Sequence, residues 1–307
     1  MTTPDSAARA PFAARLDAAV RARSSQIVLG LDPDPMRLWP GGDAQADAGT
    51  PAARAGAAIA AHCRAVIDAA GPACVAVKPQ LACFERLGAP GWAALAQAVE
   101  HAQAQGLLVV ADGKRGDIDI SAAAYAQALA GATPTPHGLV PGLGADAFTA
   151  NPYMGRDTLE VLVDGAAAAQ AGVFVLVRTS NPGAADVEDL AVAGGGTVWE
   201  HVARLVAGLG GEGPGLGDVG AVVGATRPDH VERLRDLMPR AIFLLPGVGA
   251  QGGRVEDLAA AFAPGPAGGL ITASRSIVRA HETTGGQPGA AARSEAERLR
   301  EVAWSLR

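Results

Sequence analysis

Short apolar runs rich in Val, Ile or Leu recur along the chain, and each ends in a polar or glycine-containing turn. Runs of this length without regular polar alternation are typical of strands that are buried on both faces of a parallel sheet. There are eight, at residues 27–31, 74–78, 107–112, 147–151, 173–179, 221–225, 242–246 and 269–273.

Segments with helical spacing separate most of these runs, at residues 52–70, 92–105, 120–130, 157–171, 197–209, 228–238 and 255–262. Strands that alternate with amphipathic helices indicate an α/β fold with a parallel sheet covered by helices. Because eight such units in about 250 residues match the size of a (β/α)₈ TIM barrel, we predict that class. A doubly wound open sheet is the alternative.

The chain is predicted to form a single domain over residues 1–307. A helix over 9–24 would close the bottom of the barrel, and a second over 291–306 would end the chain. Two stretches rich in Gly and Pro, 131–144 and 208–220, are predicted to be inserted surface loops.

The composition of the chain argues against nucleic-acid binding, membrane binding and secretion. With 49% hydrophobic and 18% charged residues, the 307-residue chain can bury a large core, and its net charge of −6 gives no general attraction to nucleic acid or anionic membranes. The three cysteines form no CxxC pair and are odd in number, which favours a reducing cytoplasm. No signal-peptide pattern and no membrane-spanning apolar stretch are found, so neither secretion nor membrane insertion is expected.

Lysine is almost absent, since 23 of the 25 basic residues are arginines and only Lys78 and Lys114 remain. Arginine cannot replace lysine where a compact point charge or a titratable amine is needed. Both lysines lie at the ends of adjacent predicted strands, close to Asp112 and Asp117, and Asp32 ends the first strand. Because the C-terminal ends of barrel strands converge on one mouth, we expect these groups to form one site.

Alternating ammonium and carboxylate groups keep one another ionised in a confined mouth. Asp112 would destabilise a substrate carboxylate pushed against it, while Lys114 would stabilise negative charge on carbon and deliver a proton. The alternative is a solvated ion-pair network on the rim, which explains the retention of lysine poorly.

Two segments after the seventh and eighth strands predict a phosphorylated ligand. The first, PGVGAQGG at 246–253, offers backbone donors around Gly249 and the amide of Gln251, although it could equally be a plain turn. The second offers the Ser274 hydroxyl and the Arg275 guanidinium. Phosphate sites of barrels lie after these two strands.

The segment after the fifth strand carries Thr179, Ser180 and Asn181, which suit the polar edge of a ring, although a turn without a ligand is the alternative. The six histidines show neither HxH nor HExxH spacing, so no metal site is predicted. The sequence also lacks a GxSxG elbow and a Walker A loop, and no dinucleotide fingerprint follows the first strand.

The chain carries Lys78 on one predicted strand and, after the next, the motif DGKRGD, which contains Asp112, Lys114 and Asp117. This set resembles the Lys-Asp-Lys-Asp tetrad of the orotidine 5'-phosphate decarboxylases. The similarity is closest to the longer bacterial branch of that family. The resemblance covers residues 27–277. It implies cofactor-free decarboxylation of orotidine 5'-phosphate to UMP in pyrimidine biosynthesis. DxKxxD also occurs in the related hexulose-phosphate synthase and keto-gulonate-phosphate decarboxylase barrels, which use a metal and other strand ends.

The resemblance implies catalytic roles for four residues. Lys114 would protonate C6 after CO₂ leaves, and Asp112 would crowd the substrate carboxylate. Lys78 would hold Asp112 and a ribose hydroxyl. Asp117 would reach the active site of the neighbouring subunit, which implies a homodimer.

The resemblance also implies contacts with the nucleotide. Asp32 would bind the ribose, with Ser121 contributed across the interface where the family usually has Thr. Ser180 would read the pyrimidine edge, and Gln251 and Arg275 would grip the phosphate. Ser274 stands where many members have Gly.

Two other functions stay open. One is a Mg-dependent sugar-phosphate aldolase or decarboxylase of the related barrels. The other is a nucleotide-binding barrel without chemistry, which would not need Lys114.

Overall fold

Eight parallel strands close into a barrel in the computed structural model, which describes residues 9–40, 49–249 and 252–307. The strand order around the barrel is β1-β10-β9-β8-β7-β6-β3-β2, and β1 pairs with β10 to close it. The TIM-barrel prediction is confirmed, and the open-sheet alternative is wrong. The strands are β1 (Ile27–Leu31), β2 (Ala76–Pro79), β3 (Leu108–Arg115), β6 (Ala147–Ala150), β7 (Gly172–Arg178), β8 (Val219–Val223), β9 (Phe243–Leu245) and β10 (Gly269–Ala273).

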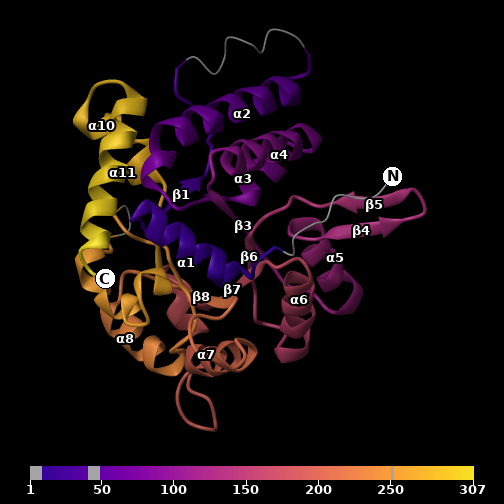
Figure 1. The fold of residues 1–307 in the computed structure, drawn as a ribbon, viewed down its shortest axis with the longest axis vertical. Helices are drawn as coiled ribbons and strands as arrows, with labels where there is room; N and C mark the ends of the chain where they lie inside the picture. The colour runs from indigo at the N-terminus through magenta and orange to yellow at the C-terminus, as the bar shows by residue number, and fades with distance from the viewer. Residues whose placement is uncertain (1–8, 41–48, 250–251) are drawn as a thin grey trace.

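Helices surround the barrel (Figure 1). They are α2 (Pro51–Ala70), α3 (Leu81–Glu85), α4 (Ala89–Ala104), α5 (Asp119–Leu129), α6 (Arg156–Ala168), α7 (Val198–Leu209), α8 (Pro228–Leu237), α9 (Arg275–Val278), α10 (Ala280–Thr284) and α11 (Pro288–Trp304). The α-helix predicted at 255–262 is instead a 3₁₀ segment, η4 (Val255–Phe262). The fully buried Leu258 leaves helical geometry there, with φ −105° and ψ 16°, and this interrupts a regular α-helix.

One end of the barrel is closed by α1 (Phe12–Arg23), which lies across it in Figure 1. The Phe12 ring meets that of Phe174 on β7 edge to face, with 5.9 Å between centroids. Asp146 is 2% exposed just before β6, and its carboxylate binds both Arg9 and Arg15. The closed end leaves the C-terminal ends of the strands as the open mouth.

The stretch 131–144, predicted as a loop, is a hairpin of β4 (Ala132–Thr135) and β5 (Gly138–Pro141) that projects from the barrel (Figure 1). Its prolines are tolerated because neither strand has another strand on its outer side. The second predicted loop, 208–220, is shorter than expected, since α7 continues to Leu209 and β8 begins at Val219.

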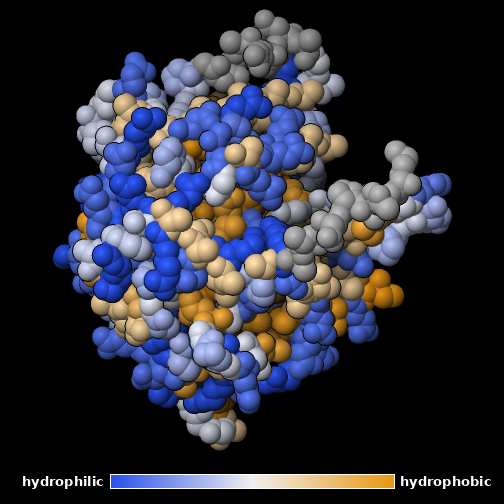
Figure 2. Space-filling view, in the orientation of Figure 1, coloured by the Kyte–Doolittle hydropathy of each residue, from blue (hydrophilic) through white to orange (hydrophobic). Residues whose placement is uncertain are grey.

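Hydrophilic side chains predominate on the face of the molecule shown in Figure 2. Within the described residues, none of the helices combines the length and the hydrophobicity that a membrane crossing demands.

A buried arginine joins α8 to the chain before β9, to η4 and to a second 3₁₀ segment, η5 (Pro266–Gly268). Arg235 is 7% exposed, and its guanidinium lies 3.8 Å from the centre of the Phe243 ring. It donates to four backbone carbonyls at 2.8–3.0 Å, those of Met238, Ala241, Ala261 and Gly268. Burial lowers the pKa of Arg235 to about 10, which still leaves it charged at neutral pH.

We expect Arg235→Ala to lower the free energy of unfolding by about 3 kcal/mol or more, because it leaves buried carbonyls without a donor. Urea denaturation measures the change. The control is Arg233→Ala on the same helix, whose side chain is 48% exposed and pairs with Glu200. Equal losses in the two variants would contradict the role of the buried bonds.

Candidate active site

The C-terminal ends of β2, β3 and β6 bring polar side chains to one wall of a cavity of about 560 Å³. Lys78 is the next-to-last residue of β2, Asp112 and Lys114 lie near the end of β3, and Thr149 lies on β6. The opposite wall comes from the loop after β7 and from the ends of β8 and β9, and includes Ser180. The cavity is lined by Lys78, Asp112, Lys114, Thr149, Leu176, Thr179, Ser180, Asn181, Gly183, Ala184, Val187, Glu188, Val222, Leu244 and Pro246.

The two lysines of the chain bind the same carboxylate. Lys78 Nζ lies 2.5 Å from Asp112 Oδ2, and Lys114 Nζ lies 2.6 Å from Asp112 Oδ1. The side chains of Lys78 and Asp112 are each 8% exposed, whereas that of Lys114 is 40% exposed toward the cavity. The structure therefore places three of the four expected tetrad residues together.

These contacts keep the buried groups charged. Burial alone would raise the pKa of Asp112, but the nearby ammonium groups of Lys78 and Lys114 outweigh it and lower that pKa to about 2. For Lys78 burial lowers the pKa, and the charges of Asp112 and Asp32 more than compensate, so the pKa is raised. Asp112 is thus an anion and Lys78 a cation at neutral pH.

Two further residues complete the surroundings of Asp112. Thr149 donates its hydroxyl proton to Asp112 Oδ1 at 2.9 Å. The amide of Gln80, turned so that its nitrogen faces Asp112, donates to Asp112 Oδ2 at 2.9 Å. With the two lysines, each carboxylate oxygen has two donors, which is the full capacity of an ionised carboxylate.

Sequence reasoning missed both Gln80 and Thr149, although a signal for each exists. Gln80 follows Lys78 by two residues, which puts both side chains on one face of an extended chain. Thr149 is the one hydroxyl residue in the predicted run 147–151, two positions after Ala147.

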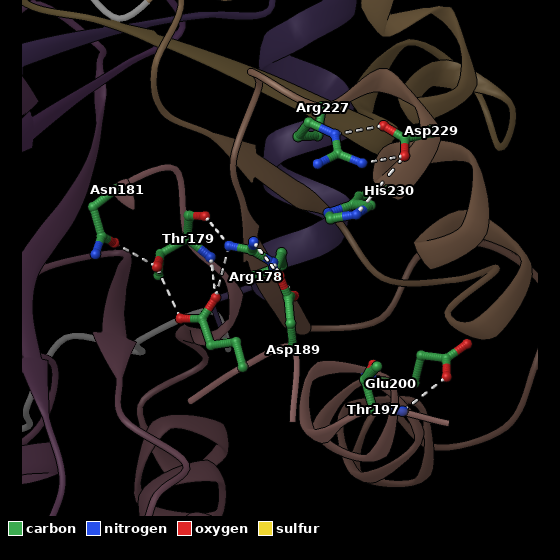
Figure 3. Close-up of polar contacts among 10 residues, drawn as sticks. Arg178, Thr179, Asn181, Asp189, Thr197, Glu200, Arg227, Asp229 and His230 are labelled. Carbon is green, nitrogen blue, oxygen red and sulfur yellow. Dashed lines mark hydrogen bonds and ion pairs between the residues drawn. The ribbon is translucent and has the colours of Figure 1, made fainter. Parts of the chain in front are cut away.

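The loop after β7 is fixed by ion pairs at its base (Figure 3). Arg178 binds Asp189 through two bonds of 3.0 and 3.1 Å and Glu188 through one of 3.1 Å. Glu188 also accepts the backbone N–H of Thr179 at 2.9 Å and its hydroxyl at 2.8 Å. Residues 178–179 are thereby joined to 188–189, and Ser180 lies between them on the cavity wall.

Three of the residues predicted to hold ribose and phosphate line a smaller hollow between the end of β1 and α9. Asp32, Ser274 and Arg275 line it together, and the charge of Asp32 reaches Lys78 in the main cavity. Gly249 lies next to α9, since a Cβ built on it would lie 3.3 Å from that of Ser276. Gln251 lies outside the described residues.

Asp117 and Ser121 do not line the cavity of their own chain. Asp117 Oδ1 accepts the backbone N–H of Ile118 at 2.8 Å, and Ser121 is exposed in the first turn of α5. Within the described part of the chain, no three His, Cys, Asp or Glu side chains are grouped so that they could hold a metal ion.

The pKa of Asp112 predicts a specific pH dependence. Ionised Asp112 stabilises the fold because its pKa falls from the ordinary 3.8 to about 2. Its contribution is complete above about pH 4 and is lost as the pH falls toward 2. We therefore expect the difference in unfolding free energy between the wild type and Asp112→Asn to be constant from pH 7 to 5 and to shrink below pH 4.

Urea unfolding at each pH measures this difference. Asp186→Asn, which removes an exposed carboxylate, controls for the general effect of charge. A gap that stays the same at pH 3 would contradict the low pKa.

Comparison with known proteins agrees with this geometry. The family model described as "Orotidine 5'-phosphate decarboxylase / HUMPS family" matches residues 25–286. The chain is 42% identical to the orotidine 5'-phosphate decarboxylase of Rhodopirellula baltica over 275 residues, covering 88% of this chain and 89% of that protein. It is 46% identical to that of Deinococcus radiodurans over 217 residues, covering 69% and 74%.

A solved structure, that of the Leishmania donovani OMP decarboxylase, matches with a TM-score of 0.70 and 32% identity, covering 95% of this chain and 99% of that one. The resemblance drawn from the residues is thus confirmed, and the chain belongs to the orotidine 5'-phosphate decarboxylase / HUMPS family.

Proposed function

We propose that this protein is a carboxy-lyase that decarboxylates orotidine 5'-phosphate to UMP without a cofactor, through Lys78, Asp112, Lys114 and Asp117. The observation that carries the proposal is the buried carboxylate of Asp112 held between two ammonium groups at a cavity wall. The names of the similar proteins support the same reaction.

The chemistry follows from the charges. Asp112 stays ionised, so a substrate carboxylate bound beside it is repelled. Breaking the bond between C6 and the carboxylate releases CO₂ and leaves the electron pair on C6. The ammonium of Lys114 stabilises this charge and donates a proton to C6, and the neutral amine then regains a proton from water.

Binding at the far end of the nucleotide supplies the energy that holds the carboxylate in place. Arg275, Ser274, Gln251 and the backbone at Gly249 would hold the phosphate. Asp32 would bind the ribose and Ser180 the pyrimidine edge. Since the chain has a net charge of −6, attraction of the anionic substrate has to be local.

The active unit would be a homodimer in which Asp117 and Ser121 complete the partner's site. Neither residue lines the cavity of its own chain, so both are available to a second one. The neighbouring Ile118 and Ile120 are 56% and 85% exposed, and a partner subunit would cover them.

A cytoplasmic location fits the cysteines. Cys63, Cys74 and Cys83 are all free thiols, as a reducing compartment would leave them.

The decisive experiment is an ultraviolet assay of orotidine 5'-phosphate consumption by the purified protein before and after exhaustive EDTA treatment. Equal rates with UMP as product are expected. Loss of activity that Mg²⁺ restores would favour the metal-dependent barrels, and binding of UMP without turnover would favour a silent nucleotide-binding barrel.

Lys114→Ala is expected to lower kcat by about 10⁴-fold or more while UMP binding stays measurable, because the proton donor and the charge that stabilises C6 are lost together. Arg275→Ala is the contrast and should raise KM by roughly 10–100-fold through the lost phosphate contact. Steady-state kinetics with UMP titration separate the two. Near-normal kcat in Lys114→Ala would refute its role.

The shared site predicts complementation. Lys114→Ala and Asp117→Ala chains are each expected to be inactive, but a mixed dimer contains one intact site, built from Lys114 of one chain and Asp117 of the other. Random exchange should restore about a quarter of wild-type activity. Native mass spectrometry verifies that mixed dimers form, and their inactivity would contradict the shared site.

A further inference from the structure

Thr149 lies on β6 at the point where that strand meets the end of β3. It is 1% exposed and lines the cavity beside Asp112 and Lys114. Phe148 packs in the core between barrel and helices, whereas Ala147 packs in the barrel interior, so the alternation along β6 points Thr149 inward.

The Thr149 hydroxyl both accepts and donates a hydrogen bond. It accepts the backbone N–H of Lys114 at 2.8 Å and donates its proton to Asp112 Oδ1 at 2.9 Å. An amide N–H can only donate and an ionised carboxylate can only accept, so the direction of both bonds is fixed. One buried side chain therefore joins the backbone of Lys114 to the carboxylate that its ammonium binds.

The backbone of Lys114 needs such a support. Lys114 has φ +48°, in the left-handed region that residues other than glycine rarely adopt, and the pairing of β3 with β6 shifts register between Ala111 and Arg115. The Lys114 side chain is 40% exposed, and among the described residues its ammonium has Asp112 as its one bonded partner. Its position in the cavity thus depends on how its backbone is held.

We infer that Thr149 is a positioning residue of the decarboxylation, which keeps the ammonium of Lys114 and the carboxylate of Asp112 in fixed relation at the reacting carbon. This inference rests on the proposed function. The hydroxyl acts through Lys114 and Asp112. Its loss should slow the chemical step much more than it weakens nucleotide binding, because the phosphate-holding residues lie in the separate hollow at β1 and α9.

The test compares Thr149→Val, which keeps the shape and removes the hydroxyl, with Thr149→Ser, which keeps the hydroxyl. We expect kcat to fall by about 10–100-fold in the valine variant, with KM and the UMP dissociation constant within about threefold of wild type. The serine variant should recover kcat to within about threefold of wild type.

Thr158→Val is the matched control. Thr158 is also buried, at 3% exposure on α6, and its hydroxyl donates to the carbonyl of Gly155 outside the cavity. It should lose stability without losing kcat. If Thr149→Val does not fold, Thr149→Ala replaces it as the variant without a hydroxyl.

Three results would overturn the inference: kcat within twofold of wild type in the variant without a hydroxyl, equal losses in the valine and serine variants, or a loss confined to KM. Failure of the proposed function is distinguishable, since the wild-type protein would then not consume orotidine 5'-phosphate at all.

Discussion

An ionised carboxylate buried inside a protein needs positive charge and hydrogen-bond donors around it. The arrangement of this site follows from how Asp112 meets that requirement. Two ammonium groups, a hydroxyl and an amide occupy its acceptor positions, so the anion is stable although its side chain is only 8% exposed. Removing Asp112 would leave the buried ammonium of Lys78 without its bonded carboxylate, which costs several kcal/mol. The same charge that the fold tolerates is the one that a substrate carboxylate would meet.

The barrel supplies the geometry for this arrangement. Because α1 closes one end, the C-terminal ends of the strands form the open mouth, and the parallel pairing of β2, β3 and β6 sets their side chains next to one another. Guanidinium groups would not serve in place of the two lysines. Each ammonium is a compact point charge. Two planar guanidinium groups would take up too much of the space around one buried carboxylate that also binds Thr149 and Gln80.

Much of this was readable from the sequence, for reasons that differ between residues. Apolar runs identified all eight barrel strands because burial on both faces leaves no polar alternation, and the scarcity of lysine singled out Lys78 and Lys114. Two partners of Asp112, Gln80 and Thr149, were missed. Thr149 stands 37 positions after Asp112 in the chain and meets it only through the pairing of β6 with β3. The hairpin itself was missed because prolines at 134, 136 and 141 disfavour strands within a sheet but not a free pair.

Different strand ends around the barrel carry the charged residues and the residues proposed to bind the nucleotide. The charged groups stand on β2 and β3, with Thr149 on β6. The residues proposed to hold ribose and phosphate follow β1, β9 and β10, and the loop proposed to read the pyrimidine edge follows β7. A nucleotide that spans these segments can be held with its carboxylate against Asp112 only if the barrel backbone does not deform. Dense packing of its interior, the closed end under α1 and the base of the β7 loop held by Arg178 all oppose such deformation. In the proposed reaction, a stiff scaffold would turn binding at one side of the site into strain on the substrate carboxylate at the other.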